Sequence, residues 1–413
     1  DDRSNEILTR VKQIDGSFDL NKILVDSAQI FKHPKINTFQ SVCLGGTFDV
    51  LHNGHRLLLT LSAMLAERRL LVGVTDNCLL KGKILAPLIQ TRECRAIAVK
   101  NLLQMIGFDV NKLEVFFLTD PFGPPAYQPD FDCIVASAET VGACEKINQM
   151  RSDKGLPLLH IEKVEFVEGR RKEALLPKDY TESKISSSSL RMNLLGRYLL
   201  KECREKLQPK GKTWIVGLTG CIASGKSSIL RLLQDSVGDL IRVIDADHLL
   251  KLFCNQIQEN CKSLRAYFAL ETVKQLDASF DIDTCEKTAI LSKIQSEIDL
   301  VLSETRSKQS AIFLEGSLLF KVGLNDLCDE VWTVYIPRSV ALSRIAKRWD
   351  MELGEEIVKH SSGLEVDWWT PCQRDSGHGP IGQSSVVFCT LWEEEFTRKQ
   401  VKRAWKYFRQ RLL

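Results

Sequence analysis

The stretch "TWIVGLTGCIASGKSSILRLLQDSV", residues 213–237, decides the fold of the second half of the chain. Its apolar start predicts a buried strand, "GCIASGKS" (220–227) fits the pattern GxxxxGK[ST], and the remainder predicts a helix. A phosphate-binding loop needs this context, because its backbone N–H groups must wrap a phosphate. We expect Lys226 to reach the β- and γ-phosphates and Ser227 to bind Mg²⁺. The nucleotide-binding residues expected here are Gly220, Cys221, Ile222, Ala223, Ser224, Gly225, Lys226, Ser227 and Ser228.

The composition is that of a globular protein, with 44% hydrophobic and 26% charged residues in a chain of 413. Lys and Arg number 56 against 53 Asp and Glu, so a general nucleic-acid binder is not indicated. No apolar run is long enough to cross a bilayer. Thirteen scattered cysteines without a CxxC pair favour reduced thiols of an intracellular protein. Because the first residue is not Met, we expect a fragment that has lost any upstream targeting segment.

Strands alternate with helices in both halves of the chain, which predicts two α/β domains with doubly wound parallel sheets. Residues 40–195 form the first predicted domain and residues 213–413 the second, which contains the phosphate loop. Residues 196–212 are the predicted linker, and residues 1–39 are an N-terminal extension of unknown role.

The last predicted helix, "FTRKQVKRAWKYFRQRLL" (396–413), has seven basic and no acidic residues. Val401, Trp405, Phe408 and Leu412 fall on one face. We expect this face to pack on the second domain, while contact with a protein partner or a membrane surface is the alternative.

The stretch "GGTFDVLHNGH", residues 45–55, is the main motif of the first half. Two glycines end a strand where backbone can approach a phosphate, and His52 and His55 begin a helix. Imidazoles at this position can donate to a triphosphate and to the charge that develops during attack at phosphorus. Two core or capping histidines are the alternative interpretation.

A second motif, "KISSSSLR" (184–191), supplies hydroxyl groups and Arg191 as a fixed cation. Together the two motifs resemble the signatures GTFDxxHxGH and ISSTxxR of the nucleotidyltransferase superfamily, with Ser188 in place of Thr. "LTDPFGP" (118–124) and "SAETVGACEKINQMRSDKGL" (137–156) resemble the phosphopantetheine adenylyltransferase branch, and they disfavour a cytidylyltransferase.

This resemblance implies that ATP and 4′-phosphopantetheine give dephospho-CoA and pyrophosphate, with Mg²⁺. It places His55 and His52 on the ATP phosphates and Thr47 on the reacting phosphate. Lys81 or Lys83 would be a mobile cation, or else a solvated surface lysine. The phosphate-binding set is completed by Gly45, Gly46, Ser186, Ser187, Ser188 and Arg191.

The second half resembles dephospho-CoA kinases through "VIDAD" (243–247), which follows the phosphate loop, and "RIAKR" (344–348), which is similar to their arginine-bearing lid. The resemblance implies that Asp247 is the base for the acceptor 3′-hydroxyl and that Asp245 is a Mg²⁺ or structural partner. Arg344 and Arg348 would neutralise transferring charge. A strand-end Asp cap and a solvated helix face are the alternatives.

The order of the two halves resembles the bifunctional coenzyme A synthases, which carry out the last two steps of coenzyme A synthesis in the cytoplasm or mitochondrion. The kinase half departs from its family at Glu315, where an aspartate is usual, and at Lys321, where an acid is usual. The alternative function is therefore an adenylyltransferase whose second half is a weak or inactive kinase that serves as an ATP-binding regulatory or scaffold module.

Overall fold

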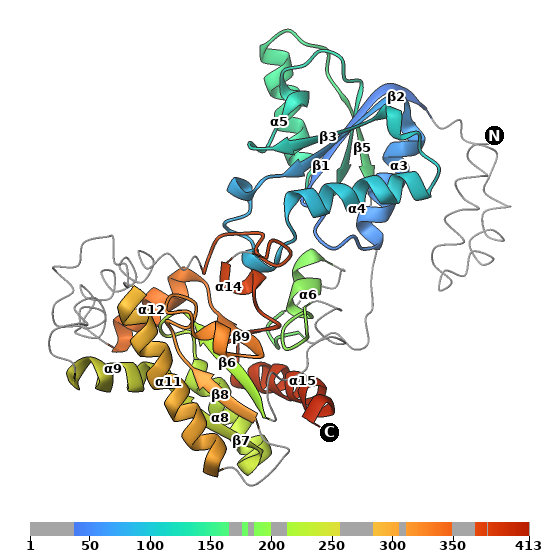
Figure 1. The fold of residues 1–413 in the computed structure, drawn as a ribbon. Coiled ribbons are helices and arrows are strands. Elements are labelled where there is room, and N and C mark those ends of the chain that lie inside the picture. Colours follow the sequence, from blue (N-terminus) through green and yellow to red (C-terminus); the bar gives the residue numbers. More distant parts are fainter. Residues whose placement is uncertain are drawn as a thin grey trace. The chain divides into compact units, whose positions relative to one another are not determined.

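The computed structural model describes residues 37–164, 176–180, 186–199, 213–256, 284–304, 311–348, 368–377 and 379–412. Most of the predicted N-terminal extension and of the predicted linker lies outside these residues. The chain divides into two compact units (Figure 1). Unit 1 is Asp1–Ile84, Gln90–Lys172 and Glu182–Leu190, and unit 2 is Leu85–Ile89, Glu173–Thr181 and Arg191–Leu413.

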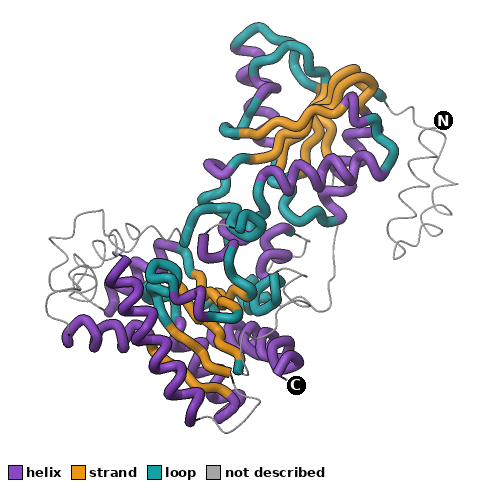
Figure 2. Tube along the Cα trace, in the orientation of Figure 1, coloured by secondary structure: helices purple, strands orange, loops and turns teal. Residues whose placement is uncertain are grey.

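Unit 1 contains a five-stranded, all-parallel sheet in the order β3-β2-β1-β4-β5. The strands are β1 (Phe39–Gly46), β2 (Ala66–Thr75), β3 (Leu113–Leu118), β4 (Cys133–Ser137) and β5 (His160–Val164). The connecting helices are α3 (Asn53–Leu65), α4 (Arg92–Met105) and α5 (Val141–Asp153); Figure 2 shows helices in purple and strands in orange. The predicted doubly wound sheet is confirmed.

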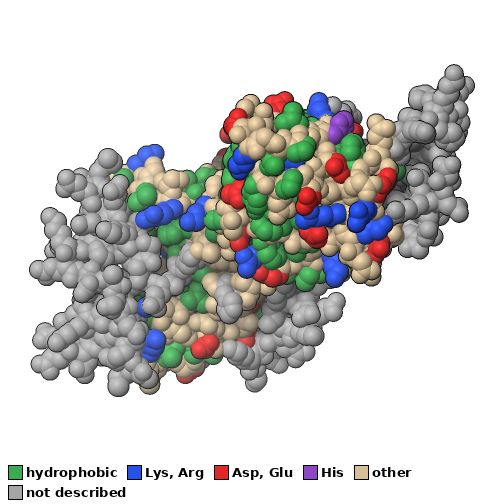
Figure 3. Space-filling model, turned by 90° about the horizontal axis from the view of Figure 1, so that it is seen from above, with side chains coloured by type: hydrophobic (Ala, Val, Ile, Leu, Met, Phe, Trp, Pro, Cys, Tyr) green, Lys and Arg blue, Asp and Glu red, His purple; other side chains and the backbone are tan. Residues whose placement is uncertain are grey.

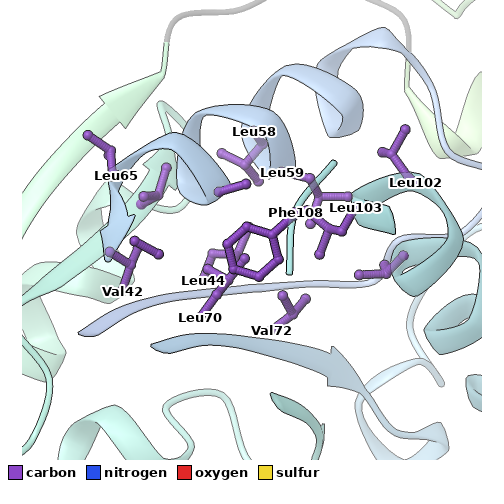
Figure 4. Packing of buried hydrophobic residues seen from close by; sticks show 14 of the residues in the cluster. Val42, Leu44, Leu58, Leu59, Leu65, Leu70, Val72, Leu102, Leu103 and Phe108 are labelled. Atoms are coloured by element: carbon purple, nitrogen blue, oxygen red, sulfur yellow. The ribbon is translucent and has the colours of Figure 1, made fainter. Parts of the chain in front are cut away.

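Alternate residues of the central strands face opposite sides of this sheet, as the two-residue period of a strand requires. Val42 and Leu44 of β1 pack with the cluster that contains α3 and α4, whereas Cys43 packs with the cluster that contains α5. Figure 4 shows Leu58 and Leu59 of α3 and Leu102 and Leu103 of α4 over the first of these faces. The sheet is thus covered on both faces, which is the usual condition of a parallel sheet.

Unit 2 repeats the architecture with the strand order β10-β9-β6-β8-β7, again all parallel. The strands are β6 (Trp214–Gly220), β7 (Ile241–Asp245), β8 (Ala311–Glu315), β9 (Glu330–Tyr335) and β10 (Val386–Cys389). Helices α8 (Lys226–Val237) and α15 (Glu394–Leu412) pack on one face, and α9 (Ala246–Gln256) and α11 (Thr284–Glu304) on the other. Two shorter helices are α12 (Arg338–Arg348) and α14 (Gly379–Gly382).

The apolar face predicted for the last helix is confirmed, because Val401, Trp405 and Phe408 of α15 are buried in the core of unit 2. The end of the helix is also held by polar contacts. Arg411 donates to Glu330 at 2.7 Å, and Glu330 accepts a further hydrogen bond from Tyr198 at 2.7 Å. The Glu330 side chain is fully buried, so losing either donor would leave a charge poorly compensated.

The described surface carries both signs of charge, and Figure 3 shows Lys and Arg side chains interspersed with Asp and Glu on the face in view. Nine cysteines of the described residues are free thiols. Among the described residues, no helix combines the length and the apolar character that a membrane span needs.

Candidate active sites

The first site lies where β1 ends, at the point where the strand order of the sheet reverses between β1 and β4. Ligands bind at such switch points in parallel sheets. The turn that follows β1 is unusual, because Phe48 and Val50 both have left-handed backbone angles, with φ of 53° and 48°. Asp49 between them is fully buried and accepts the Gln90 N–H at 3.0 Å. The aspartate of the motif therefore orients the turn locally.

Arg95 of α4 fixes the same turn from beneath. Its guanidinium is fully buried and donates to the carbonyl oxygens of Thr47 at 2.7 Å, Thr75 at 2.9 Å and Gln90 at 2.9 Å. A planar five-donor group can hold three chain segments at once, whereas a lysine cannot. The position of Thr47, the residue expected to hold the reacting phosphate, is set by this contact.

The two histidines of the motif stack on each other, with ring centroids 3.9 Å apart. His52 precedes α3 and His55 lies in its first turn, and a Cβ at Gly54 would come within 3.1 Å of the His52 ring. Burial lowers the pKa of His52 to about 4; burial and the nearby His52 lower that of His55 to about 3. Both rings are therefore neutral at pH 7.

Nδ1 of His52 and Nδ1 of His55 are buried and have no hydrogen-bond partner among the described residues. A buried polar atom without a partner is costly, so such atoms call for a ligand. Their place at the N-terminus of α3 adds free backbone N–H groups and the positive end of the helix dipole. The pair fits a polyphosphate better than it fits the alternative of two satisfied core histidines.

The second motif meets the first at a hydrogen bond, in which the Ser187 hydroxyl donates to the Asp49 carbonyl at 2.9 Å. Helix α6 (Ser187–Met192) begins here, and the Ser186 hydroxyl caps it by accepting the Ser189 N–H at 3.2 Å. Ser188 is half-buried, and Arg191 on the same helix has a buried side chain. Motifs separated by more than 130 residues in sequence are thus brought together.

Lys81 and Lys83 lie exposed on a turn that follows a short 3₁₀ helix at Asn77–Leu79. An exposed lysine on a turn can swing toward a bound phosphate. Their proposed role as mobile cations stays a prediction.

The second site is the phosphate loop between β6 and α8, in the predicted strand–loop–helix context. Gly225 has φ of 93°, and a Cβ at Gly220 would lie 2.4 Å from the Val334 carbonyl oxygen, so both positions need glycine. Lys226 folds back over the loop and donates to the carbonyl oxygens of Gly220 at 3.1 Å and Cys221 at 3.4 Å. Its ammonium group therefore already lies over the phosphate cradle.

Carboxylates gather beside the loop at the ends of β7 and β8. The Ser227 hydroxyl donates to Glu315 at 2.9 Å. Burial raises the pKa of Glu315, while the Ser227 hydrogen bond and Lys226 oppose the shift. A hydroxyl next to carboxylates is an oxygen donor set that suits Mg²⁺, which keeps its remaining positions for phosphate and water.

Asp245 and Asp247 have different environments. Asp245 caps α9 by accepting the His248 N–H at 2.8 Å, so the capping alternative describes what its side chain does here. Asp247 points to the loop after β8, where Ser317 donates to it from its N–H at 3.0 Å and from its hydroxyl at 2.8 Å. Asp247 is thereby held next to Glu315.

Arg344 of α12 holds the phosphate loop through hydrogen bonds to its backbone and to Thr390. It donates to the Ala223 carbonyl at 3.1 Å and to both the hydroxyl and the carbonyl of Thr390. The Thr390 hydroxyl in turn donates to the Ser224 carbonyl at 2.6 Å. The structure thus places Arg344 on loop carbonyls. The side chain of Arg348, the other predicted lid arginine, lies outside the described residues.

In the comparisons with known proteins, two different family models match the two halves of the chain. Residues 43–193 match the family model described as Cytidylyltransferase-like, and residues 214–361 match the one described as Dephospho-CoA kinase. The phosphopantetheine adenylyltransferase of Methanopyrus kandleri is 34% identical over 155 residues, which are 37% of this chain and 89% of that relative. The chain belongs to the phosphopantetheine adenylyltransferase family. In the same chain, the adenylyltransferase segment is followed by a segment that matches dephospho-CoA kinase.

A second member of the phosphopantetheine adenylyltransferase family, from Saccharomyces cerevisiae, is 34% identical over 155 residues. These are 38% of this chain and 48% of the relative, so the chain spans about half the length of that protein. Among solved structures, dephospho-CoA kinase from Campylobacter jejuni covers 48% of this chain and 97% of its own, at 17% identity and a TM-score of 0.29.

Three residues of these sites were not predicted from the sequence: Arg95, Ser317 and Thr390. Glu315 was expected only as a departure from the aspartate that is usual in the kinase family, although it ends a predicted strand whose neighbour carries the phosphate loop, which is a usable signal for a site residue. Arg95 and Thr390 had none, since each acts on backbone carbonyls that are remote in sequence.

Proposed function

We propose that unit 1 transfers the adenylyl group of ATP to 4′-phosphopantetheine and that unit 2 phosphorylates the 3′-hydroxyl of the resulting dephospho-CoA with a second ATP. One observation carries the proposal: a single chain joins a phosphopantetheine adenylyltransferase segment to a segment that matches dephospho-CoA kinase. The product of the first reaction is the substrate of the second. Because the kinase match includes the whole phosphate loop, the alternative of a non-catalytic second half is not favoured.

In unit 1, an oxygen of the substrate phosphate attacks the α-phosphorus of ATP, and the bond to the β-phosphate oxygen breaks to release pyrophosphate. No side-chain nucleophile is required, so the residues position the reactants and stabilise charge. We assign His52 and His55 to the ATP phosphates, since each presents a neutral, buried and unpartnered ring nitrogen. Thr47 holds the reacting phosphate, and the fixed contact of Arg95 with its carbonyl supports that assignment.

In unit 2, the γ-phosphate passes to the acceptor hydroxyl, whose proton goes to Asp247. The contacts from Ser317 hold that carboxylate in one orientation. Lys226 would leave the loop carbonyls for the β- and γ-phosphates. Mg²⁺, when bound by the Ser227 hydroxyl and the neighbouring carboxylates, would supply charge neutralisation. The nine free thiols of the described residues agree with a reducing compartment, which we propose to be the cytoplasm or the mitochondrion.

Two separate assays test the proposal. The protein is given ATP and Mg²⁺ with either 4′-phosphopantetheine or dephospho-CoA, and pyrophosphate or ADP is measured. His55→Ala should abolish only the first reaction and Lys226→Ala only the second, since each unit has its own phosphate site. ATP binding without turnover of dephospho-CoA would instead establish the regulatory module, and loss of both reactions in either variant would contradict the division of labour.

A further inference from the structure

Among the described residues, the basic side chains of α15 form two groups, and only one group has partners. Arg411 belongs to the partnered group through Glu330. Arg398 and Lys399 pair with glutamates one turn earlier, and Arg403 donates to backbone carbonyls. Lys402 and Lys406 are exposed, and neither makes an ion pair among the described residues.

Arg409 is also exposed and makes no ion pair among the described residues. We call Lys402, Lys406 and Arg409 the cationic stripe. Their spacing of four and three residues places them along one side of the helix. A stripe of unpaired charge creates a positive potential that attracts anions.

The cationic stripe lines a groove of about 360 Å³ between α15 and α8. Val401 and Trp405 provide its apolar floor, with 1% and 8% of their surfaces exposed, and Ser236 and Gln410 also line it. No acidic residue of the described chain lines the groove. The volume lies at the lower end of the range of about 300–1,000 Å³ that is usual for ligand pockets.

From this arrangement we propose that the groove is a docking site for an acidic amphipathic helix of a partner protein. A helix laid along α15 repeats the four-and-three spacing, so its carboxylates meet the cationic stripe one by one. An apolar side chain between these carboxylates reaches the Trp405 floor. A flat anionic membrane would meet the stripe but would leave the recessed floor empty.

The test uses the full chain and a fluorescent helical peptide of about 18 residues, which is five turns of helix. The peptide carries Glu at three positions with the four-and-three spacing and a Phe between them, and a matched peptide carries Gln at those positions. Anisotropy should show saturable binding of the Glu peptide and at least about tenfold weaker binding of the Gln peptide.

Two variants locate the site. Changing the whole cationic stripe to Glu should weaken binding of the Glu peptide about tenfold or more. The same change of charge at the exposed Lys100, Lys146 and Lys154 of unit 1 should not. Ser236→Trp, which fills the groove without changing charge, should also weaken binding.

Four results would overturn the proposal. These are no saturable binding, equal binding of the two peptides, equal loss in the stripe and control variants, and an unaffected Ser236→Trp protein. Binding to phosphatidylserine vesicles that the Glu peptide does not displace, with no binding of the peptide itself, would instead identify a membrane surface. Both catalytic reactions should persist in the stripe variant, so its outcome is independent of the proposed activities.

Discussion

Replacing Thr390 by Val tests whether the brace behind the phosphate loop is needed for phosphoryl transfer. Valine keeps the shape of threonine and has a methyl group in place of the hydroxyl. That hydroxyl donates to the Ser224 carbonyl at 2.6 Å and accepts from Arg344 at 2.9 Å. Arg344 keeps its contact with the Ala223 carbonyl. The main effect is therefore that the carbonyl of the buried Ser224 loses its hydrogen-bond donor.

Leaving one buried acceptor without its donor costs about 1–3 kcal/mol. If this free energy holds the loop in its binding geometry, the competent fraction falls by about 5–150-fold. We therefore expect kcat/KM for ATP in the dephospho-CoA reaction to fall by the same factor of about 5–150. The adenylyl-transfer reaction of the same preparation should be unchanged, which also shows that the protein is intact.

The chain offers a matched control in Thr219, the residue before the last of β6, next to the loop. It is fully buried, and its hydroxyl has no hydrogen-bond partner among the described residues. Thr219→Val should therefore leave kinase activity within about twofold of the parent, because it removes no hydrogen bond. A Thr390→Val protein with unchanged kcat/KM, or with no more loss than Thr219→Val, would refute the role of the brace.

Three further predictions concern acid stability, backbone strain and the metal site. Folding lowers the pKa of His52 and His55 from 6.5 to about 4 and about 3, so the unfolded chain binds protons before the folded chain does as pH falls. Unit 1 should therefore lose stability from about pH 6.5 downward. Replacing both histidines by Asn should flatten the curve of Tm against pH. An equal decline in both proteins would count against this. Gly196→Ala places a Cβ 2.3 Å from a backbone oxygen of α15 at a residue with φ +67°. Gly323→Ala is the control, because that residue has φ +79° and open space around it. Unfolding of unit 2 should need less denaturant in Gly196→Ala, with a free energy of unfolding lower by about 1–3 kcal/mol than in the control. Glu315→Gln should raise the Mg²⁺ concentration for half-maximal kinase activity by about tenfold, and an unchanged Mg²⁺ titration would remove it from the metal site.

Local patterns were enough to predict both sheets, because a strand buried on two faces and a glycine turn before a helix leave clear marks in sequence. The pairing of the GTFD and serine motifs followed from the family resemblance, and the Ser187–Asp49 contact brings them together. The order of strands did not follow from the patterns, since it depends on which neighbour each crossover reaches.

The supporting residues escaped prediction for a different reason. Arg95 binds backbone carbonyls of three segments, and a carbonyl carries no residue type that a pattern could detect. Asp245 shows the opposite case. Its position suggested a metal ligand or a cap, and the choice depends on where its side chain lies in the fold, with its oxygen accepting the His248 N–H.

The burial of α15 in unit 2 also bears on how the protein is made. The helix supplies Val401, Trp405 and Phe408 to the same hydrophobic cluster as β6 and α8. This face of the unit 2 sheet therefore stays uncovered until residues 394–412 have been synthesised. In the part of the chain that the structure describes, all strands and core residues of unit 1 precede Leu190, so this unit can fold during translation. The nascent second half therefore exposes apolar surface for longer, and it is the half that we expect to engage chaperones.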